Sequence, residues 1–122
     1  MANPFVHVEL ATTDLGKAKD FYGKLFAWKL EDVPMEHGSY TLIKVGEGTG
    51  GGMMKHPMPG ESSSWLAYVS VDDIAQATQK AKSLGAKIVK DVTEIKGIGS
   101  FSIFTDPTGA TLALWQEMQK KG

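Results

Sequence analysis

The chain has 122 residues, of which 42% are hydrophobic and 22% are charged, a balance that fits one compact globular domain. Thirteen basic and 14 acidic residues give a net charge of −1, without a Lys/Arg stripe interleaved with aromatic residues, so we expect no nucleic-acid partner. The absence of cysteine excludes disulfide scaffolds, thiolate ligands and thiol nucleophiles. No apolar run is long enough to span a bilayer, and we therefore expect a cytoplasmic protein with no membrane partner.

The first half of the chain, at about residues 4–55, predicts one strand, one helix and three further strands. Alternating apolar residues indicate the opening strand, namely Val6, Val8 and Leu10. Thr13 or Asp14 can cap a helix whose apolar stripe follows at positions i, i+3, i+7 and i+10, namely Leu15, Ala18, Tyr22 and Leu25. Three extended segments follow at about 28–35, 40–45 and 51–55.

A linker rich in Pro, Gly and Ser, at about 56–63, leads to a second half at about 64–117 with the same pattern. Its opening strand alternates at Trp65, Ala67, Val69 and Val71. Asp72 or Asp73 can cap a helix that ends before Gly85 and has its apolar stripe at Ile74, Ala77, Ala81 and Leu84. Extended segments follow at about 87–95, 100–105 and 110–116.

The two helices repeat one spacing, with Asp14 and Asp73 lying 59 positions apart, so the chain contains an internal repeat. We expect an α+β fold in one domain, 1–122, made of two β-α-β-β-β modules. Two four-stranded sheets, each with a helix on one face, can curve into an eight-stranded open cup that binds a small molecule. The repeat also pairs His7 with Leu66 and Glu9 with Tyr68.

Three segments carry a family resemblance: HVELATTDLGKAKDFYGKLFAWK, WLAYVSVDDIAQATQKAKSLGAKI and FTDPTGATLALWQ. In this order they resemble the vicinal oxygen chelate superfamily, which includes glyoxalase I, bleomycin-resistance proteins and extradiol dioxygenases. The resemblance implies paired β-α-β-β-β modules, often in a homodimer. It also implies one divalent cation in the cup, with ligands from the first and last strand of each module.

The resemblance places the metal ligands at His7, Leu66, Ala113 and a position within GGGMMK, residues 50–55. Only His7 offers a suitable donor atom, because Leu and Ala have none and methionine sulfur suits these cations poorly. A catalytic metal site usually has about three protein ligands. We therefore predict no cofactor, while a divalent metal held by His7 and Glu9 stays open. His37 and His56 fall in a turn and in the linker, where exposed histidines are ordinary.

His7 and Glu9 stand two residues apart on a strand, so their side chains share one face, and we predict both as candidate catalytic residues. The alternative is a hydrogen-bonded strand histidine and a solvated carboxylate. The predicted ligand-binding residues are Met53, Leu66, Tyr68, Ala113 and Trp115. For Met53 the alternative is packing in the core, and for Trp115 it is packing in the core or in a dimer.

Two functions follow from these observations. The first is a small-molecule-binding protein of the glyoxalase/bleomycin-resistance type, without the usual metal site, that forms a homodimer. The second is a metal-dependent lyase, isomerase or dioxygenase of the same superfamily that uses His7 and Glu9 with ligands from elsewhere, including a partner subunit. Metal-free isomerisation or epimerisation, with Glu9 or His7 as the base, is also open.

Overall fold

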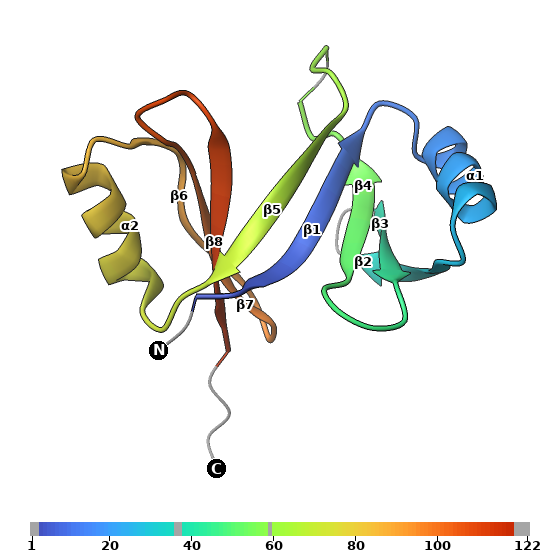
Figure 1. The fold of residues 1–122 in the computed structure, drawn as a ribbon, viewed down its shortest axis with the longest axis horizontal. Coiled ribbons are helices and arrows are strands. Elements are labelled where there is room, and N and C mark those ends of the chain that lie inside the picture. Colours follow the sequence, from blue (N-terminus) through green and yellow to red (C-terminus); the bar gives the residue numbers. More distant parts are fainter. Residues whose placement is uncertain (1–2, 36–37, 59, 119–122) are drawn as a thin grey trace. The chain divides into compact units, whose positions relative to one another are not determined.

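The computed structural model describes residues 3–35, 38–58 and 60–118, and both halves of this part of the chain have the order β-α-β-β-β (Figure 1). The elements of the first half are β1 (Phe5–Thr12), α1 (Leu15–Leu25), β2 (Lys29–Met35), β3 (Gly38–Lys44) and β4 (Gly51–Lys55). Those of the second half are β5 (Ser64–Ser70), α2 (Ile74–Ser83), β6 (Lys87–Ile95), β7 (Gly99–Thr105) and β8 (Thr111–Glu117). The predicted α+β class is confirmed.

The chain forms two compact units, which we call the first unit (7–66) and the second unit (the residues up to Val6 together with those from Ala67 onward). In the first unit the strand order is β2-β3-β4-β1, with β1 and β4 parallel and the other neighbours antiparallel. The second half repeats this pattern as β6-β7-β8-β5, with β5 and β8 parallel.

Both helices begin at the aspartates that the sequence indicates. Asp14 accepts a hydrogen bond from the Lys17 backbone N–H through Oδ1 at 3.0 Å, and Asp73 accepts one from the Gln76 N–H in the same way at 3.0 Å. Such caps satisfy backbone donors that have no partner inside the helix. Gly85, with φ +103°, takes the left-handed conformation just after α2, so the predicted end of this helix is also confirmed.

The core of the first unit lies between α1 and one face of its sheet. Leu10, Ile43 and Met53 are buried there. Partly buried apolar residues pack against them, namely Leu15, Ala18, Tyr22, Trp28, Leu30 and Val45. Three of the four predicted stripe residues of α1 therefore face the core. The fourth, Leu25, is 55% exposed because it is the last residue of the helix.

The face of the second sheet that α2 covers is partly polar. Ile74 and Thr78 are the buried residues of α2, and the Thr78 and Ser102 hydroxyl oxygens lie 2.8 Å apart. The Ile74 N–H donates to Oε1 of Gln116 at 2.7 Å. The sequence pattern predicted Leu84 in this contact, but its side chain is 70% exposed beyond the end of the helix. Ser102 and Gln116 thus point toward α2, and their strand neighbours point away from it.

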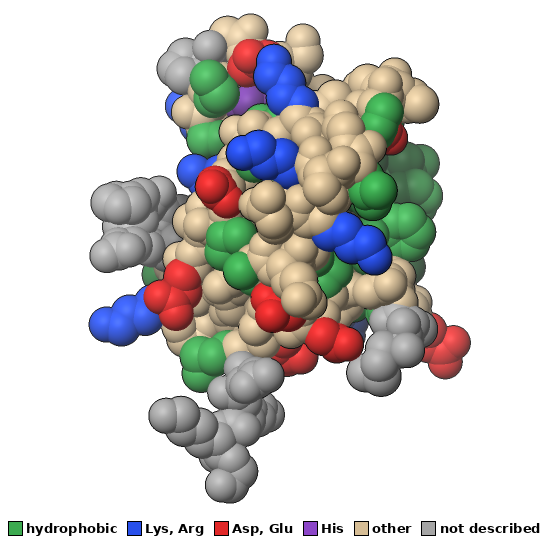
Figure 2. Space-filling view, turned by 90° about the vertical axis from the view of Figure 1, so that its left-hand side faces the viewer, with side chains coloured by type: hydrophobic (Ala, Val, Ile, Leu, Met, Phe, Trp, Pro, Cys, Tyr) green, Lys and Arg blue, Asp and Glu red, His purple; other side chains and the backbone are tan. Residues whose placement is uncertain are grey.

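The surface mixes charges of both signs. On the face that Figure 2 shows, Lys side chains lie among Asp and Glu side chains, and positive charge does not gather into one continuous area there. The expectation of no nucleic-acid partner stays a prediction. Among the described residues, neither helix has the length and apolar character needed to cross a membrane.

Candidate functional site

A chain of hydrogen bonds joins three side chains on the face of the first sheet that points away from α1. The Tyr40 hydroxyl lies 2.7 Å from Nε2 of His7 and donates to Oε2 of Glu9 at 2.9 Å. All three side chains are half-buried. The structure therefore brings the two predicted catalytic candidates together through a third residue, Tyr40.

Strand register explains why the Tyr40 side chain reaches this place. Glu9 of β1 pairs with Gly52 of β4, and Gly52 pairs with Leu42 of β3, so these residues and Tyr40, two positions from Leu42, share one face. Gly52 is necessary for the arrangement. A Cβ atom at this position would overlap the Tyr40 hydroxyl and ring.

We assign the hydrogen of the His7 ring from the bonding pattern. The phenol has one hydrogen, which it donates to the Glu9 carboxylate, a charge-assisted bond. The Tyr40 oxygen then accepts from His7, so Nε2 is the protonated nitrogen. The order of donors is His7 to Tyr40 to Glu9.

Burial lowers the pKa of His7 below its ordinary value of 6.5, and the nearby charge of Glu9 opposes this shift. The folded protein thus binds the His7 proton less tightly than the unfolded chain does. We expect the contribution of His7 to the free energy of unfolding to be complete above pH 6.5 and to be lost as the pH falls through the lowered pKa. Urea denaturation of the native protein and of His7→Gln, across this range, measures the difference.

His56→Gln is the matched control, because His56 lies in the linker, where its Nδ1 accepts from the Met58 N–H. We expect the pH dependence of this variant to match that of the native protein. A His7→Gln protein that loses as much stability on acidification as the native protein would contradict the role given to His7.

A group of aromatic side chains lies on the face of the second sheet that points away from α2. Tyr68 of β5 pairs with Ala113 of β8, and Trp115 of β8 pairs with Phe101 of β7. The Tyr68 and Phe101 rings meet edge to face, with centroids 6.4 Å apart. Phe101 and Trp115 are half-buried, so part of each ring reaches the surface.

Gly99 sets the position of the Trp115 indole. A Cβ atom at Gly99 would lie 2.6 Å from Cζ2 and 2.9 Å from Cη2 of Trp115. The ring therefore lies across β7 where that strand has no side chain. In both units an aromatic ring thus covers a strand glycine: Tyr40 at Gly52 and Trp115 at Gly99.

Two of the predicted ligand-binding residues have no surface that a ligand could contact. Met53 is 0% exposed because its side chain points to the α1 face, where it packs with Leu10 and Ile43. Ala113 is also 0% exposed. Met53 therefore lies in the core, and Ala113 lies between Tyr68 and Ile103 of the neighbouring strands, so the burial of both residues speaks against a ligand contact.

The other predicted ligand-binding residues divide between the two units. Leu66 is half-buried on β5 and belongs to the first unit, as do His7 and Glu9. Tyr68 and Trp115 belong to the second unit, where Tyr68 is buried at 7% exposure. His7 and Glu9 thus belong to a polar group in the first unit, and Tyr68 and Trp115 belong to an aromatic group in the second.

The donor atoms do not fit the divalent cation that the resemblance implies. Among the described residues, no three His, Asp or Glu side chains lie close enough together to hold a metal ion. Nε2 of His7 and one oxygen of Glu9 are bonded to Tyr40, and the Tyr40 phenol fills the space beside Gly52. His56 is bonded within the linker, and His37 lies outside the described residues. That the protein works without a cofactor stays a prediction.

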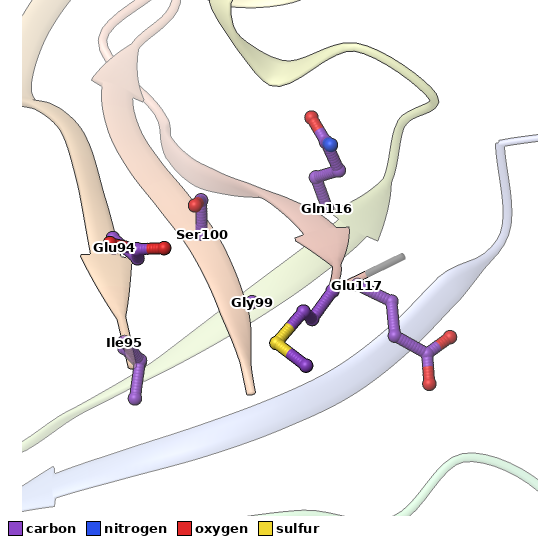
Figure 3. Close-up of a pocket in the computed structure, with 7 residues that line it drawn as sticks. Glu94, Ile95, Gly99, Ser100, Gln116 and Glu117 are labelled. Atoms are coloured by element: carbon purple, nitrogen blue, oxygen red, sulfur yellow. The ribbon is translucent and has the colours of Figure 1, made fainter. Parts of the chain in front are cut away.

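Two cavities lie elsewhere in the units. One, of about 280 Å³ in the first unit, is mainly apolar and is lined by Val8, Trp28, Ile43, Val45, Thr49, Gly50, Gly51 and Trp65. The other, of about 220 Å³ in the second unit, is lined by Glu94, Ile95, Gly99, Ser100, Gln116, Glu117 and Met118. Its polar groups do not converge, since the Gln116 and Glu117 side chains leave β8 in different directions (Figure 3).

Sequence reasoning missed Tyr40 and Phe101. Both residues alternate with polar residues on their strands, in GSYTLIK and GSFSIFT, so each has a definite face. Which face this is depends on pairing with strands distant in sequence. For Tyr40 the sequence offers one signal, the glycine on the neighbouring strand that its ring covers, Gly52.

Comparison with known proteins agrees with this fold. The model of the Glyoxalase/Bleomycin resistance protein/Dioxygenase superfamily matches residues 5–114. The hypothetical protein BH1468 from Bacillus halodurans C-125 has a similar structure, with a TM-score of 0.72 and 18% sequence identity, covering 100% of this chain and 99% of that chain.

Two curated proteins resemble the sequence over most of its length. The putative glyoxylase CFP32 of Mycobacterium bovis is 35% identical over 117 residues, which cover 89% of this chain and 44% of that protein. The anthracycline biosynthesis protein DnrV of Streptomyces peucetius is 26% identical in an alignment of 132 positions, which covers 93% of this chain and 47% of that protein. The chain spans less than half the length of either relative.

Proposed function

Because the chain belongs to the glyoxalase/bleomycin resistance protein/dioxygenase superfamily, we propose that it binds a planar aromatic small molecule without the usual metal ion. The ligand lies against the aromatic group of the second unit. In this function His7, Tyr40 and Glu9 do not hold a cation.

One observation carries the proposal: Trp115 and Phe101, both half-buried, are paired across β8 and β7 on the sheet face that points away from α2. Aromatic rings offer a large, rigid contact area and favour offset-stacked or edge-to-face geometries with other rings. The Tyr68 ring, on β5, packs edge to face against the Phe101 ring. The group therefore presents a firm apolar surface to a flat ligand.

The relatives suggest a probe. DnrV is named for anthracycline biosynthesis, and an anthracycline is a planar, polycyclic aromatic compound. An anthracycline is also fluorescent, so its binding is measured directly by fluorescence anisotropy. We therefore choose daunorubicin as the probe of the aromatic group.

We expect Trp115→Ala to weaken daunorubicin binding at least tenfold, because Trp115 supplies the largest ring of the group. A tenfold loss corresponds to about 1.4 kcal/mol, which lies within the range of an aromatic anchor at an interface. Fluorescence anisotropy of the drug, titrated with each protein, gives the dissociation constants.

Trp65→Ala is the matched control, because Trp65 is a strand tryptophan of the first unit that is 42% exposed and contacts Tyr22. Its affinity for the drug is expected to stay within about twofold of the native value. Equal losses in both variants, or none in Trp115→Ala, would count against the aromatic group as the ligand site.

The alternative function is that of a metal-dependent lyase, isomerase or dioxygenase that uses His7 and Glu9. The name of CFP32, a putative glyoxylase, supports it.

Elemental analysis of protein purified without chelators separates the two functions, together with melting before and after addition of Mn²⁺, Ni²⁺, Zn²⁺ or Fe²⁺. A ligand at 100 times its dissociation constant stabilises the folded state by about 2.7 kcal/mol. Stoichiometric metal that is lost in His7→Ala would favour the enzyme.

The homodimer belongs to the same proposal. Phe21 and Phe26 of the first unit keep 56% and 44% of their surface exposed, which supports self-association through apolar contacts. Sedimentation velocity over a range of protein concentrations tests for it.

A further inference from the structure

We infer that Tyr40 prevents a divalent cation from binding between His7 and Glu9, because its hydroxyl occupies the position that the ion would need. The inference rests on the proposed metal-free function and gives a structural cause for it.

The Tyr40 hydroxyl lies between a nitrogen of His7 and an oxygen of Glu9. His7 and Glu9 project from one face of β1, and the Tyr40 oxygen lies 2.7 Å from the imidazole nitrogen of His7 and 2.9 Å from the carboxylate oxygen of Glu9. A cation bound by both side chains would have to approach the same two atoms. The phenol satisfies both of them, accepting from His7 and donating to Glu9, and it adds no charge.

Gly52 of the neighbouring strand β4 leaves room for the Tyr40 ring. Gly52 lies directly across from Glu9, where a side chain from β4 would point to the same face. Any side chain at this position would overlap the Tyr40 ring. A third ligand from β4 and the Tyr40 phenol therefore exclude each other.

Nε2 is the nitrogen of His7 that faces the Tyr40 hydroxyl. Because the Tyr40 hydrogen goes to Glu9, Nε2 of His7 carries a hydrogen and has no lone pair to offer a metal. A metal ion held by both Nε2 of His7 and Oε2 of Glu9 would have to displace this proton and break both hydrogen bonds. The arrangement of the three side chains, beyond the shortage of ligands, thus opposes metal binding.

Histidine ring NMR with Ni²⁺ alone as the probe tests the inference, since paramagnetic Ni²⁺ broadens the signals of a coordinating imidazole. In the native protein the His7 signals should persist at Ni²⁺ concentrations that broaden those of His56. In Tyr40→Ala, His7 should broaden at a Ni²⁺ concentration at least tenfold lower than in the native protein. The double variant Tyr40→Ala/Gly52→Glu adds a carboxylate beside Glu9 and should bind at least tenfold more tightly again.

Leu42→Ala is the matched control, because Leu42 lies on the same face of β3 and pairs with Gly52. We expect its His7 response to equal that of the native protein. The inference is overturned if His7 of the native protein broadens as readily as that of Tyr40→Ala. It is also overturned if both Tyr40 variants give folded spectra and no His7 response.

A measurement on the native protein alone keeps the test independent of variant folding. Long-range ¹H–¹⁵N spectra at neutral pH should show the Nε2–H form of His7. The Nδ1–H form, with Nε2 as acceptor, would overturn the inference.

Daunorubicin titrations separate this result from the proposed function. If the drug binds through Trp115 while His7 of the native protein takes up Ni²⁺, the role of Tyr40 fails and the aromatic site stands. If Ni²⁺ does not broaden the His7 signals of the native protein while Trp115→Ala leaves drug affinity unchanged, the proposed ligand site fails. The role of Tyr40 then stands.

Discussion

Gly51→Ala is expected to lower the free energy of unfolding by about 3 kcal/mol or more, at the upper end of the cost of overpacking. A Cβ atom at Gly51 would overlap the Val8 carbonyl oxygen and lie 3.0 Å from the carbonyl carbon. These are backbone atoms of β1, paired with β4 at this position, so no rotamer change can relieve the overlap. The two strands would have to move apart. This would also separate the paired core residues Leu10 and Met53. Urea denaturation measures the loss.

Gly23→Ala is the control for this substitution. Gly23 lies inside α1, and a Cβ atom there would meet Cδ1 of Leu30 at 3.7 Å, an ordinary contact. Replacing a helix-interior glycine with alanine stabilises by about 0.5–1 kcal/mol, so we expect a small gain. A Gly51→Ala protein as stable as the native one would show that β1 and β4 do not approach as closely as this geometry requires.

Local patterns predicted the elements of the fold. The strand alternation, the repeated helix stripe and the two aspartate caps depend on residues a few positions apart, and all three are found in the structure. Asp14 and Asp73 act identically because each begins a helix that directly follows a strand. The prediction was weaker at helix ends. Leu25 and Leu84 continue the stripe in sequence but lie where each helix ends, and both are exposed.

The candidate site was only partly predictable, because it depends on pairing between distant strands. His7 and Glu9 could be grouped from the sequence because both stand on one strand. Tyr40 joins them only through the register of β1 with β4 and of β4 with β3. A shift of one residue in either register would turn Tyr40 to the opposite face. Sequence alone does not give that register.

The position of Met53 depends on strand pairing in the same way. The GGGMMK segment lets either methionine face the helix, and the choice follows from the pairing of Leu10 with Met53. This register sends Met53 to the core and Met54 to the face that carries Glu9 and Tyr40. The alternative that the sequence left open, packing in the core, describes Met53.

Met53→Ala is therefore expected to lower the free energy of unfolding by about 2–5 kcal/mol, the usual cost of truncating a buried methionine. Met53 is 0% exposed and packs between Leu10 and Ile43, so its loss leaves a cavity in the main cluster of the first unit. Urea denaturation gives the stability. Daunorubicin affinity, measured where the variant is fully folded, should stay within about twofold of the native value, because Met53 has no surface for a ligand.

Met54→Ala is the matched control, one residue along the same strand. Met54 is half-buried on the opposite face, and its truncation should cost less than that of Met53 because fewer packing contacts are lost. The decisive comparison is between stability and affinity. If Met53→Ala unfolds with nearly native stability but binds the drug tenfold more weakly, Met53 contacts the ligand, and the register of β4 against β1 is wrong. A large loss of stability with unchanged affinity places Met53 in the core and leaves recognition of the ligand to the aromatic group around Trp115.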